Sequence, residues 1–315
     1  MGTDPIESLV WQVDVGRLRE DVKHLSRGDR HSLYSPVRHA ECAEYISTVF
    51  AECGLEISRQ SYKTAHELAG RSCINIIGLK SPASPQELPS LLVSAHYDTV
   101  HGSSGADDNA SGVAALLECA RLLSKTQLRR PVQFIAFDME ETQPEGPGLV
   151  GSSAFIESAV DKSAYAGLYN LEMVGYTSGP GTQGYPPGFQ LILPGVYERV
   201  RQRDFRGDFI AIVAQGSGIE MARRFADAAG RWVPNLSVLN IEVNYTLPIL
   251  ADIFRSDHAP FWAAGIPAVM VTDTAEFRNP NYHQPTDTLD TLDFEFMGNV
   301  TRALVATLAQ HGEIC

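Results

Sequence analysis

The segment from His96 to Asn109, HYDTVHGSSGADDN, constrains the fold of this 315-residue chain more than any other stretch. The apolar run at 91–95 before it is typical of a buried strand, and the pattern after it is typical of a helix. A strand therefore ends on a histidine, and a helix begins beside Asp107 and Asp108. In open α/β sheets, ligand sites lie at the carboxyl ends of strands. The segment thus predicts a metal centre rather than a packing feature.

Three further apolar, strand-like runs lead into residues that bind metals in proteins. Glu140 and Glu141 follow the second run, and Glu172 ends the third. His283 lies in the loop after the fourth. Imidazole and carboxylate groups form the nitrogen and oxygen ligand set that suits zinc. With two histidines and three or four carboxylates, this inventory fits two metals that share one carboxylate, a pair that lies about 3.5–4 Å apart.

Six motifs follow one another over most of residues 74–310. They are HYD at His96, GADDNASG, EE at Glu140, LEM at Glu172, SDH at Ser256 and YH at Tyr282. In these motifs, and in their order and spacing, the chain resembles the double-zinc aminopeptidases. The relatives of that family include glutamate carboxypeptidase II and the zinc-dependent glutaminyl cyclases.

The resemblance implies the ligands of two zinc ions. One zinc ion would be held by His96, Asp108 and Glu172. The other would be held by Asp108, Glu141 and His283, so that Asp108 bridges the two. The family's usual third ligand to the first zinc is aspartate, and Glu172 is longer by one methylene group. This departure changes the spacing or the occupancy of the first site, so one zinc ion per chain is the alternative.

The same resemblance implies roles for three more side chains. Glu140 would act as the general base. Asp98 would hold the second ring nitrogen of His96. Tyr282 occupies the position where aminopeptidases of this family place a tyrosine that helps to stabilise the oxyanion.

Each of these residues also has a simpler interpretation. Asp107, Asp108 or Asn109 would cap the following helix well. Adjacent glutamates commonly lie on a solvated loop edge. Glu172, however, ends an apolar strand, where an ionised carboxylate is costly unless it is paired or metal-bound. Because the ligands occur together and in order, we interpret them as a metal site.

Other segments are expected to surround the metal site, and the absence of two motifs argues against other enzyme classes. The insertion at 142–148 follows the glutamate pair, so we expect it to form pocket walls with residues 178–188 and 275–281. We expect Asp257 near the metals and His258 outside the site. The sequence has no GxSxG elbow and no GxGxxG directly after a strand, which argues against a serine hydrolase and a dinucleotide site.

Composition excludes further classes. The net charge of −13 argues against a nucleic-acid-binding surface. No apolar run reaches the roughly 20 residues that span a bilayer. The first residues lack the pattern of a signal peptide, so we expect a cytoplasmic protein, or a secreted or periplasmic one if a leader has been removed. The five cysteines include no CxxC and predict buried thiols, with one disulfide as the alternative.

Alternating strand and helix patterns predict an α/β fold, a three-layer α/β/α sandwich over a mostly parallel mixed central sheet. We expect one catalytic domain over residues 1–315, with N-terminal helices at about 5–53. The expected helices are 6–25, 37–53, 110–124, 151–159, 219–229, 258–264 and 294–311. The expected strands are 73–79, 91–96, 132–137, 168–172, 190–193, 209–213 and 268–271.

Together these features predict a zinc-dependent exopeptidase. As an aminopeptidase, it would hydrolyse the N-terminal bond of peptide or aminoacyl substrates through a metal-bridging water that gives its proton to Glu140. A glutaminyl cyclase that forms N-terminal pyroglutamate is the alternative, although such enzymes typically carry Trp where this chain has Tyr282, and usually work with one zinc ion. The second alternative is a non-catalytic binding protein of the same fold.

Overall fold

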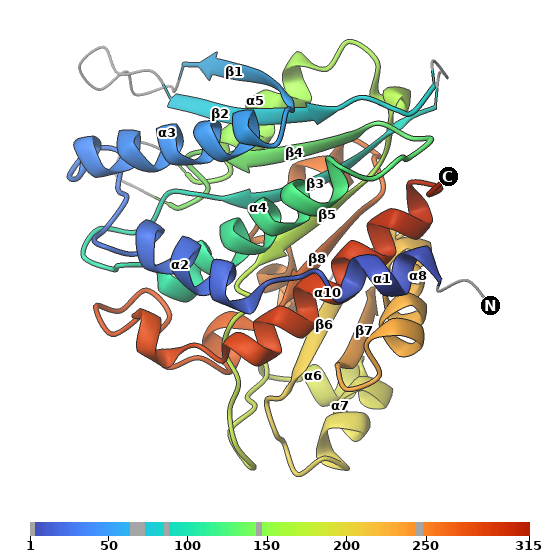
Figure 1. Cartoon of the computed structure of the whole chain (residues 1–315). Helices are drawn as coiled ribbons and strands as arrows, with labels where there is room; N and C mark the ends of the chain where they lie inside the picture. Colours follow the sequence, from blue (N-terminus) through green and yellow to red (C-terminus); the bar gives the residue numbers. More distant parts are fainter. Residues whose placement is uncertain (1–3, 64–72, 85–87, 143–146, 244–247) are drawn as a thin grey trace.

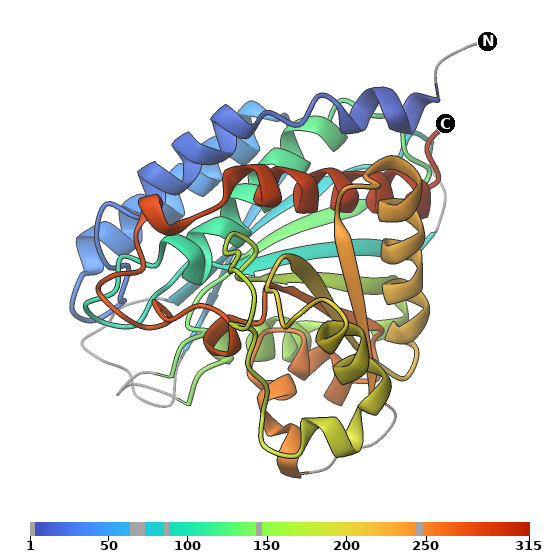
Figure 2. The same ribbon diagram turned by 90° about the horizontal axis from the view of Figure 1, so that it is seen from below.

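A mixed sheet forms the middle layer of the molecule, and helices cover both of its faces (Figures 1 and 2). The computed structural model describes residues 4–63, 73–84, 88–142, 147–243 and 248–315. The predicted three-layer α/β/α sandwich is confirmed. The strands are β1 (Glu56–Tyr62), β2 (Cys73–Lys80), β3 (Ser90–His96), β4 (Val132–Phe137), β5 (Tyr165–Glu172), β6 (Phe209–Gln215), β7 (Ser237–Val243) and β8 (Ala268–Thr272).

The α-helices of the described residues are interspersed with these strands along the chain. They are α1 (Pro5–Val10), α2 (Val15–Leu25), α3 (Pro36–Glu52), α4 (Gly112–Leu123), α5 (Val150–Ser158), α6 (Phe189–Ile192), α7 (Pro194–Arg201), α8 (Gly218–Trp232), α9 (Ala259–Ala263) and α10 (Phe294–His311). Helices α1, α2, α3, α4, α8 and α10 contribute to the large core on one face of the sheet. Helices α5 and α9 pack on the other face.

Four neighbouring strands in the middle of the sheet are parallel. The strand order is β1-β2-β4-β3-β5-β8-β6-β7, and β4, β3, β5 and β8 run in the same direction. Strands β2 and β6 flank them in antiparallel orientation. The carboxyl ends of the four parallel strands therefore lie side by side at one edge of the sheet, where ligand sites form in α/β folds.

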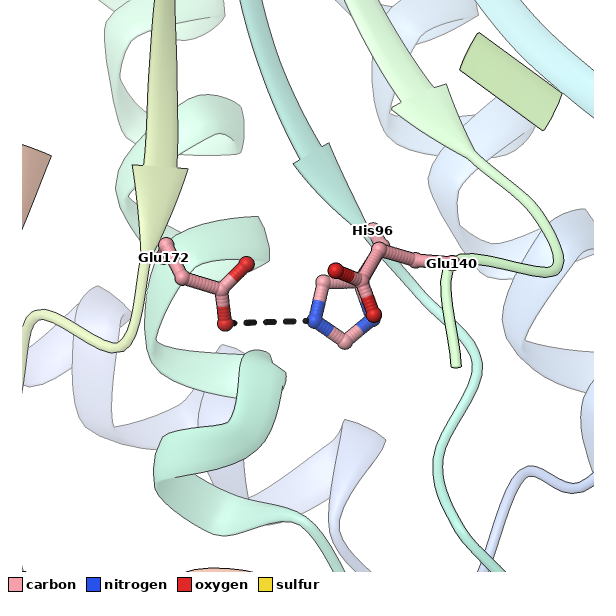
Figure 3. Close-up of side chains that lie close together, drawn as sticks. All are labelled: His96, Glu140 and Glu172. Carbon is pink, nitrogen blue, oxygen red and sulfur yellow. Dashed lines mark ion pairs between the residues drawn. The ribbon is translucent and has the colours of Figure 1, made fainter. Parts of the chain in front are cut away.

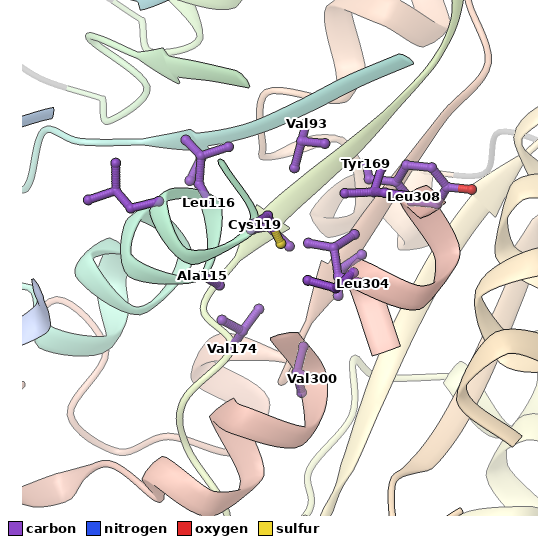
Figure 4. Packing of buried hydrophobic residues seen from close by; sticks show 14 of the residues in the cluster. Val93, Ala115, Leu116, Cys119, Tyr169, Val174, Val300, Leu304 and Leu308 are labelled. Carbon is purple, nitrogen blue, oxygen red and sulfur yellow. The ribbon is translucent and has the colours of Figure 1, made fainter. Parts of the chain in front are cut away.

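Alternate side chains along the strands pack on different helical layers. Val93 of β3 and Tyr169 of β5 lie with Leu116 of α4 and Leu304 of α10 (Figure 4). Leu92, the neighbour of Val93, packs on the opposite face with residues of α5 and α9. Successive side chains of a strand point to opposite faces, so a strand covered on both sides is mostly apolar along its whole length.

The helix expected at 6–25 is two helices. Helix α1 ends at Val10, and α2 begins after Asp14. The Asp14 side chain accepts hydrogen bonds from the backbone N–H groups of Gly16 and Arg17. Aspartate is a favoured N-cap, so it begins a new helix within an apolar pattern that looks continuous.

The strand expected at 190–193 is wrong, because residues 189–192 form helix α6. A short apolar run fits either element. Strands β1 and β7 were not expected. They lie at the two outer edges of the sheet and are only partly buried, so they lack the continuous apolar run of the inner strands.

The expectation of buried thiols holds for Cys42 and Cys119, which are fully buried, whereas Cys53 and Cys73 are partly buried and Cys315 is exposed. Among the helices of the described residues, none is long and apolar enough to cross a membrane.

Candidate metal centre

The parallel strands place predicted site residues in one cluster. Strand β3 ends on His96, β5 ends on Glu172, and Glu140 and Glu141 follow β4. Asp108 lies in the irregular turn before α4. The side chain of Glu172 is 12% exposed, and the others are buried. Figure 3 shows His96 and Glu172 at the ends of their strands, with Glu140 beside them on the loop after β4.

Asp108 lies between two imidazoles. Its Oδ1 atom is 3.2 Å from Nε2 of His96, and its Oδ2 atom is 3.2 Å from Nε2 of His283. Nε2 of His96 also lies 3.5 Å from Oε1 of Glu172. Nε2 of His283 lies 3.1 Å from Oε2 of Glu141. The two oxygens of Asp108 thus belong to two separate groups of ligand atoms, as a bridging carboxylate requires.

These distances fit metal coordination. Ligands about 2.0–2.1 Å from a tetrahedral zinc ion lie about 3.3–3.4 Å from one another, and the four distances above lie on either side of that value. Within the described residues, Nε2 of His96 and Nε2 of His283 are buried and face carboxylate oxygens, but neither makes a well-directed hydrogen bond. A cation between each nitrogen and the facing oxygens would satisfy both. The residues therefore fit two cations.

Glu140 stands beside the first group of ligands. His96, Glu140 and Glu172 offer donor atoms that all lie within 4.8 Å of one another, and Asp108, Glu141 and His283 do the same. By distance alone, Glu140 could replace Asp108 in the first group. The 3.2 Å approach of Asp108 to both imidazoles favours Asp108 as the shared ligand and leaves the Glu140 carboxylate for another role.

Negative charge exceeds positive charge in the cluster. Burial and the neighbouring Asp108 raise the pKa of Glu141 to about 7. Burial alone would lower the pKa of His283, but the facing carboxylates of Asp108 and Glu141 raise it to about 10. Burial raises the pKa of Glu140 well above its usual range. Without cations the cluster must hold protons, and two divalent cations would compensate the same charge.

Asp98 joins the first histidine to the glutamate loop. Its Oδ1 and Oδ2 atoms accept hydrogen bonds from the backbone N–H groups of Glu140 and Glu141, at 3.1 and 3.2 Å. Oδ1 also lies 3.3 Å from Nδ1 of His96. Asp98 is fully buried, so it fixes the imidazole and the loop relative to each other.

Tyr282 and Asp257 lie at the site, whereas His258 does not bind there. The ring of Tyr282 stacks on the ring of His283, with 3.8 Å between centroids. Asp257 is fully buried and lies close enough to interact electrostatically with His96 and Glu172, and burial raises its pKa to about 7. Nε2 of His258 lies 2.7 Å from the carbonyl oxygen of Ile253. These positions agree with the expectations for Asp257 and His258.

Asp287 has a positioning role that the sequence did not reveal. Its carboxylate accepts hydrogen bonds from the backbone N–H groups of Asp107, at 2.9 Å, and Asp108, at 3.1 Å. Asp287 is fully buried. It therefore holds the backbone of the shared ligand from the loop that carries His283. Its place soon after the YH motif is the only signal of this role in the sequence.

Arg30 supports the same segment from the N-terminal side. The residue is 1% exposed, and its guanidinium donates to backbone carbonyl groups of the segment that links β3 to Asp108. The acceptors are the carbonyl oxygens of Leu25, Tyr97, Ser104 and Gly105, at 2.8–3.0 Å. No motif marks Arg30, because its partners are distant in sequence.

A cavity of about 520 Å³ opens beside the ligands. All three segments expected to form its walls contribute, namely Thr142 and Pro147, Gln183 to Pro186, and Ala275 to Phe277, while residues 143–146 lie outside the described part of the chain. The apolar end of the cavity is the part lined by the hydrophobic cluster between the sheet and helices α6 and α7, which includes Phe189, Phe209, Val213, Leu239, Ile241 and Met270.

Comparisons with known sequences agree with this geometry. A family model described as peptidase family M28 matches residues 75–185 and 217–308. The uncharacterized protein YfbL of Escherichia coli K12 is 35% identical over 276 residues, which are 84% of this chain and 78% of YfbL. The aminopeptidase YwaD of Bacillus subtilis is 29% identical over 226 residues, which are 70% of this chain and 41% of YwaD. The match thus spans less than half the length of YwaD.

Solved structures share the fold. BSAP, a zinc aminopeptidase from Bacillus subtilis, superposes with a TM-score of 0.70 at 17% identity, over 95% of each chain. A glutaminyl cyclase from Porphyromonas gingivalis superposes with a TM-score of 0.69 at 17% identity, over 95% of this chain and 99% of the cyclase. At these identities the likeness concerns the fold alone, and both reactions occur on it.

Proposed function

This chain belongs to peptidase family M28, and from that premise we propose that it is a zinc-dependent aminopeptidase that hydrolyses the N-terminal bond of peptide or aminoacyl substrates. The observation that carries the proposal is the position of Asp108, whose two oxygens each face a different imidazole at 3.2 Å. The similarity to the aminopeptidases YwaD and BSAP supports the same class of reaction.

Two groups of side chains would hold the metals. His96, Asp108 and Glu172 would bind the first zinc ion. Asp108, Glu141 and His283 would bind the second. Zinc, when bound, supplies Lewis acidity that lowers the pKa of water and polarises a carbonyl group.

Glu140 and Tyr282 would complete the site. Glu140 is buried, lines the cavity, and has a pKa that burial raises, so it would take a proton from the attacking water and return it to the leaving amine. Tyr282 lines the same cavity, and its hydroxyl group would donate to the developing oxyanion.

The carboxylates and the cavity support an exopeptidase with an apolar preference. The α-ammonium group of a substrate would find its counter-charge among the buried carboxylates, including Glu172. The first side chain of the substrate would then enter the apolar end of the cavity, between the sheet and helices α6 and α7. We therefore propose substrates with a large apolar N-terminal residue.

The test combines metal content with two assays on the full-length protein. We expect hydrolysis of leucine p-nitroanilide and about two zinc ions per chain by elemental analysis. Pyroglutamate formation from a peptide that begins with Gln, with one zinc ion, would instead identify a cyclase. Zinc-loaded protein that is inactive in both assays would favour a binding protein. The E140Q variant, purified in parallel, controls for contaminating peptidases.

A further inference from the structure

Arg255 lies against the tyrosine that is proposed to stabilise the oxyanion. It follows the short 3-10 helix Pro248–Phe254 and begins the segment that contains the SDH motif. Its Nη2 atom donates a hydrogen bond of 2.9 Å to the hydroxyl oxygen of Tyr282. Both side chains line the cavity beside the candidate metal ligands.

The chemistry of the two groups fixes the direction of this hydrogen bond. A guanidinium group has donors and no acceptor, so the phenol oxygen must be the acceptor. The phenol proton is then available for a different partner. Among the described residues, the structure records no acceptor for it. Because the ring of Tyr282 is held against the His283 ring, the hydroxyl group stays at the cavity wall while its proton is free to point inward.

Arg255 is itself held in place. Its Nη1 atom pairs with Glu276 and lies 3.3 Å from Oδ1 of Asp252. The side chain is 45% exposed, so these pairs order a group that would otherwise move in solvent. Ser256, the next residue, donates a hydrogen bond of 2.6 Å to Oε2 of Glu172. The backbone that carries Arg255 is therefore tied to the metal centre.

We propose that Arg255 is a positioning residue that acts through Tyr282. It occupies the phenol oxygen as an acceptor, directs the O–H group toward the oxyanion, and strengthens that O–H as a donor by placing a cation next to it. This inference rests on the proposed aminopeptidase function, and nothing in it requires Arg255 to touch the substrate.

A double-mutant cycle on the zinc-loaded protein tests the proposal. Removal of one oxyanion donor costs about 10²–10³ in kcat, and we expect a loss in this range for Y282F on leucine p-nitroanilide. For R255M we expect a loss in kcat of about tenfold with KM changed less than about twofold.

In the Y282F background, R255M should reduce kcat by no more than about twofold further, because the hydroxyl group through which Arg255 acts is absent. The matched control is R223M, which removes an exposed arginine of α8 that pairs with Glu242 of β7.

Two results would overturn the proposal. If R255M causes its full loss in the Y282F background, Arg255 acts without Tyr282. If R255M raises KM and leaves kcat unchanged, Arg255 binds substrate.

A second readout needs neither zinc nor turnover. In protein labelled with ¹³C at Cζ of tyrosine, the resonance of Tyr282 is the one that is absent from the spectrum of Y282F. We expect this resonance to shift in R255M and to stay in place in R223M. An unchanged resonance in R255M would mean that the hydrogen bond is absent in solution, and the proposal would fail. If R255M shifts the Tyr282 resonance but the zinc-loaded parent protein shows no turnover, the hydrogen bond is present and the proposed function is wrong. The role of the pair in catalysis would then fail with it.

Discussion

The hydroxyl group of Ser256 donates a hydrogen bond of 2.6 Å to Oε2 of Glu172, while Oε1 of the same carboxylate faces His96 at 3.5 Å. One oxygen is thus committed to a serine, and one remains for a metal. The serine oxygen in turn accepts from Nδ2 of Asn170 at 2.8 Å, and Ser94 donates to the Asn170 side chain at 2.6 Å. A glutamate in place of the family's aspartate is therefore fixed by a buried relay, and we expect it to bind zinc through Oε1 alone.

The S256A variant should weaken the first zinc site. Partners that orient a metal ligand typically contribute about 10- to 100-fold to metal affinity, and Ser256 is the donor to Glu172. Competition with a chromophoric chelator would measure the two zinc affinities, with the second expected to stay unchanged. The exposed Ser8 of α1, replaced as S8A, is the control. Equal affinities in S256A and S8A would show that Glu172 needs no such support.

Replacement of Glu172 itself separates the two sites. In E172A the first zinc ion should bind more weakly, while Asp108, Glu141 and His283 keep the second. E172D should retain much of the activity, because a carboxylate remains. Zinc titration followed by elemental analysis measures both effects. Were E172A to bind both ions as tightly as the parent, Glu172 would not be a ligand and a one-zinc enzyme would become the better description.

The E140Q variant should separate metal binding from turnover. Glutamine keeps the size of the side chain but cannot take a proton, and loss of a general base costs about 10²–10⁴ in rate. Zinc content should stay at the parental value while kcat on aminoacyl anilides falls. Retained turnover would assign the base elsewhere, and lost zinc would make Glu140 a ligand.

Strand ends and motif order predicted the cluster of His96, Asp108 and Glu172, because an apolar strand that ends on a charged residue is visible in one dimension. The supports of that cluster were not visible. Asp287 holds the backbone of Asp108 from 179 residues away, and Arg30 reaches the same segment from the N-terminal loop. Such contacts depend on tertiary folding and leave no local pattern.

The backbone conformation of the residues that follow the strands could not be predicted from the sequence either. Met139, Met173 and His283 have φ angles of 57°, 54° and 57°, a region that side chains other than glycine rarely adopt. Each such residue costs about 1–3 kcal/mol, which the surrounding structure must offset. Propensity disfavours these conformations, so sequence patterns do not predict them. They turn the chain sharply next to Glu140 and Glu172 and at His283 itself.

His258 should make the fold less stable in acid. It is fully buried, its Nε2 atom lies 2.7 Å from the carbonyl oxygen of Ile253, and within the described residues its Nδ1 atom has no partner. Burial lowers its pKa to about 4 from 6.5. Between these two pH values the unfolded chain therefore binds a proton at His258 that the folded chain does not bind. The contribution of neutral His258 to stability is complete above pH 6.5 and is lost as the pH falls toward 4.

The effect of His258 is measurable by urea unfolding in EDTA, which removes any contribution from zinc. Between these pH values the free energy of unfolding should fall by up to about 1.4 kcal/mol per pH unit from this group. In H258Q, whose amide can still donate to Ile253, that part of the slope should disappear. Parallel pH profiles for parent and H258Q would contradict a neutral buried histidine.

The V213F variant should narrow the apolar end of the cavity and change substrate preference. Val213 lies on β6, is 3% exposed, and lines the apolar end of the cavity, so a larger side chain would fill the space proposed for the first side chain of the substrate. One methylene group in an apolar pocket changes kcat/KM by about 10- to 200-fold. We therefore expect the ratio of kcat/KM for leucine p-nitroanilide to that for alanine p-nitroanilide to fall by about tenfold or more.

The alanine substrate and the zinc content serve as internal controls for V213F, because neither depends on the depth of the cavity. A loss that is equal for both substrates would mean that the substrate side chain lies elsewhere, and the apolar cavity would not be the specificity pocket.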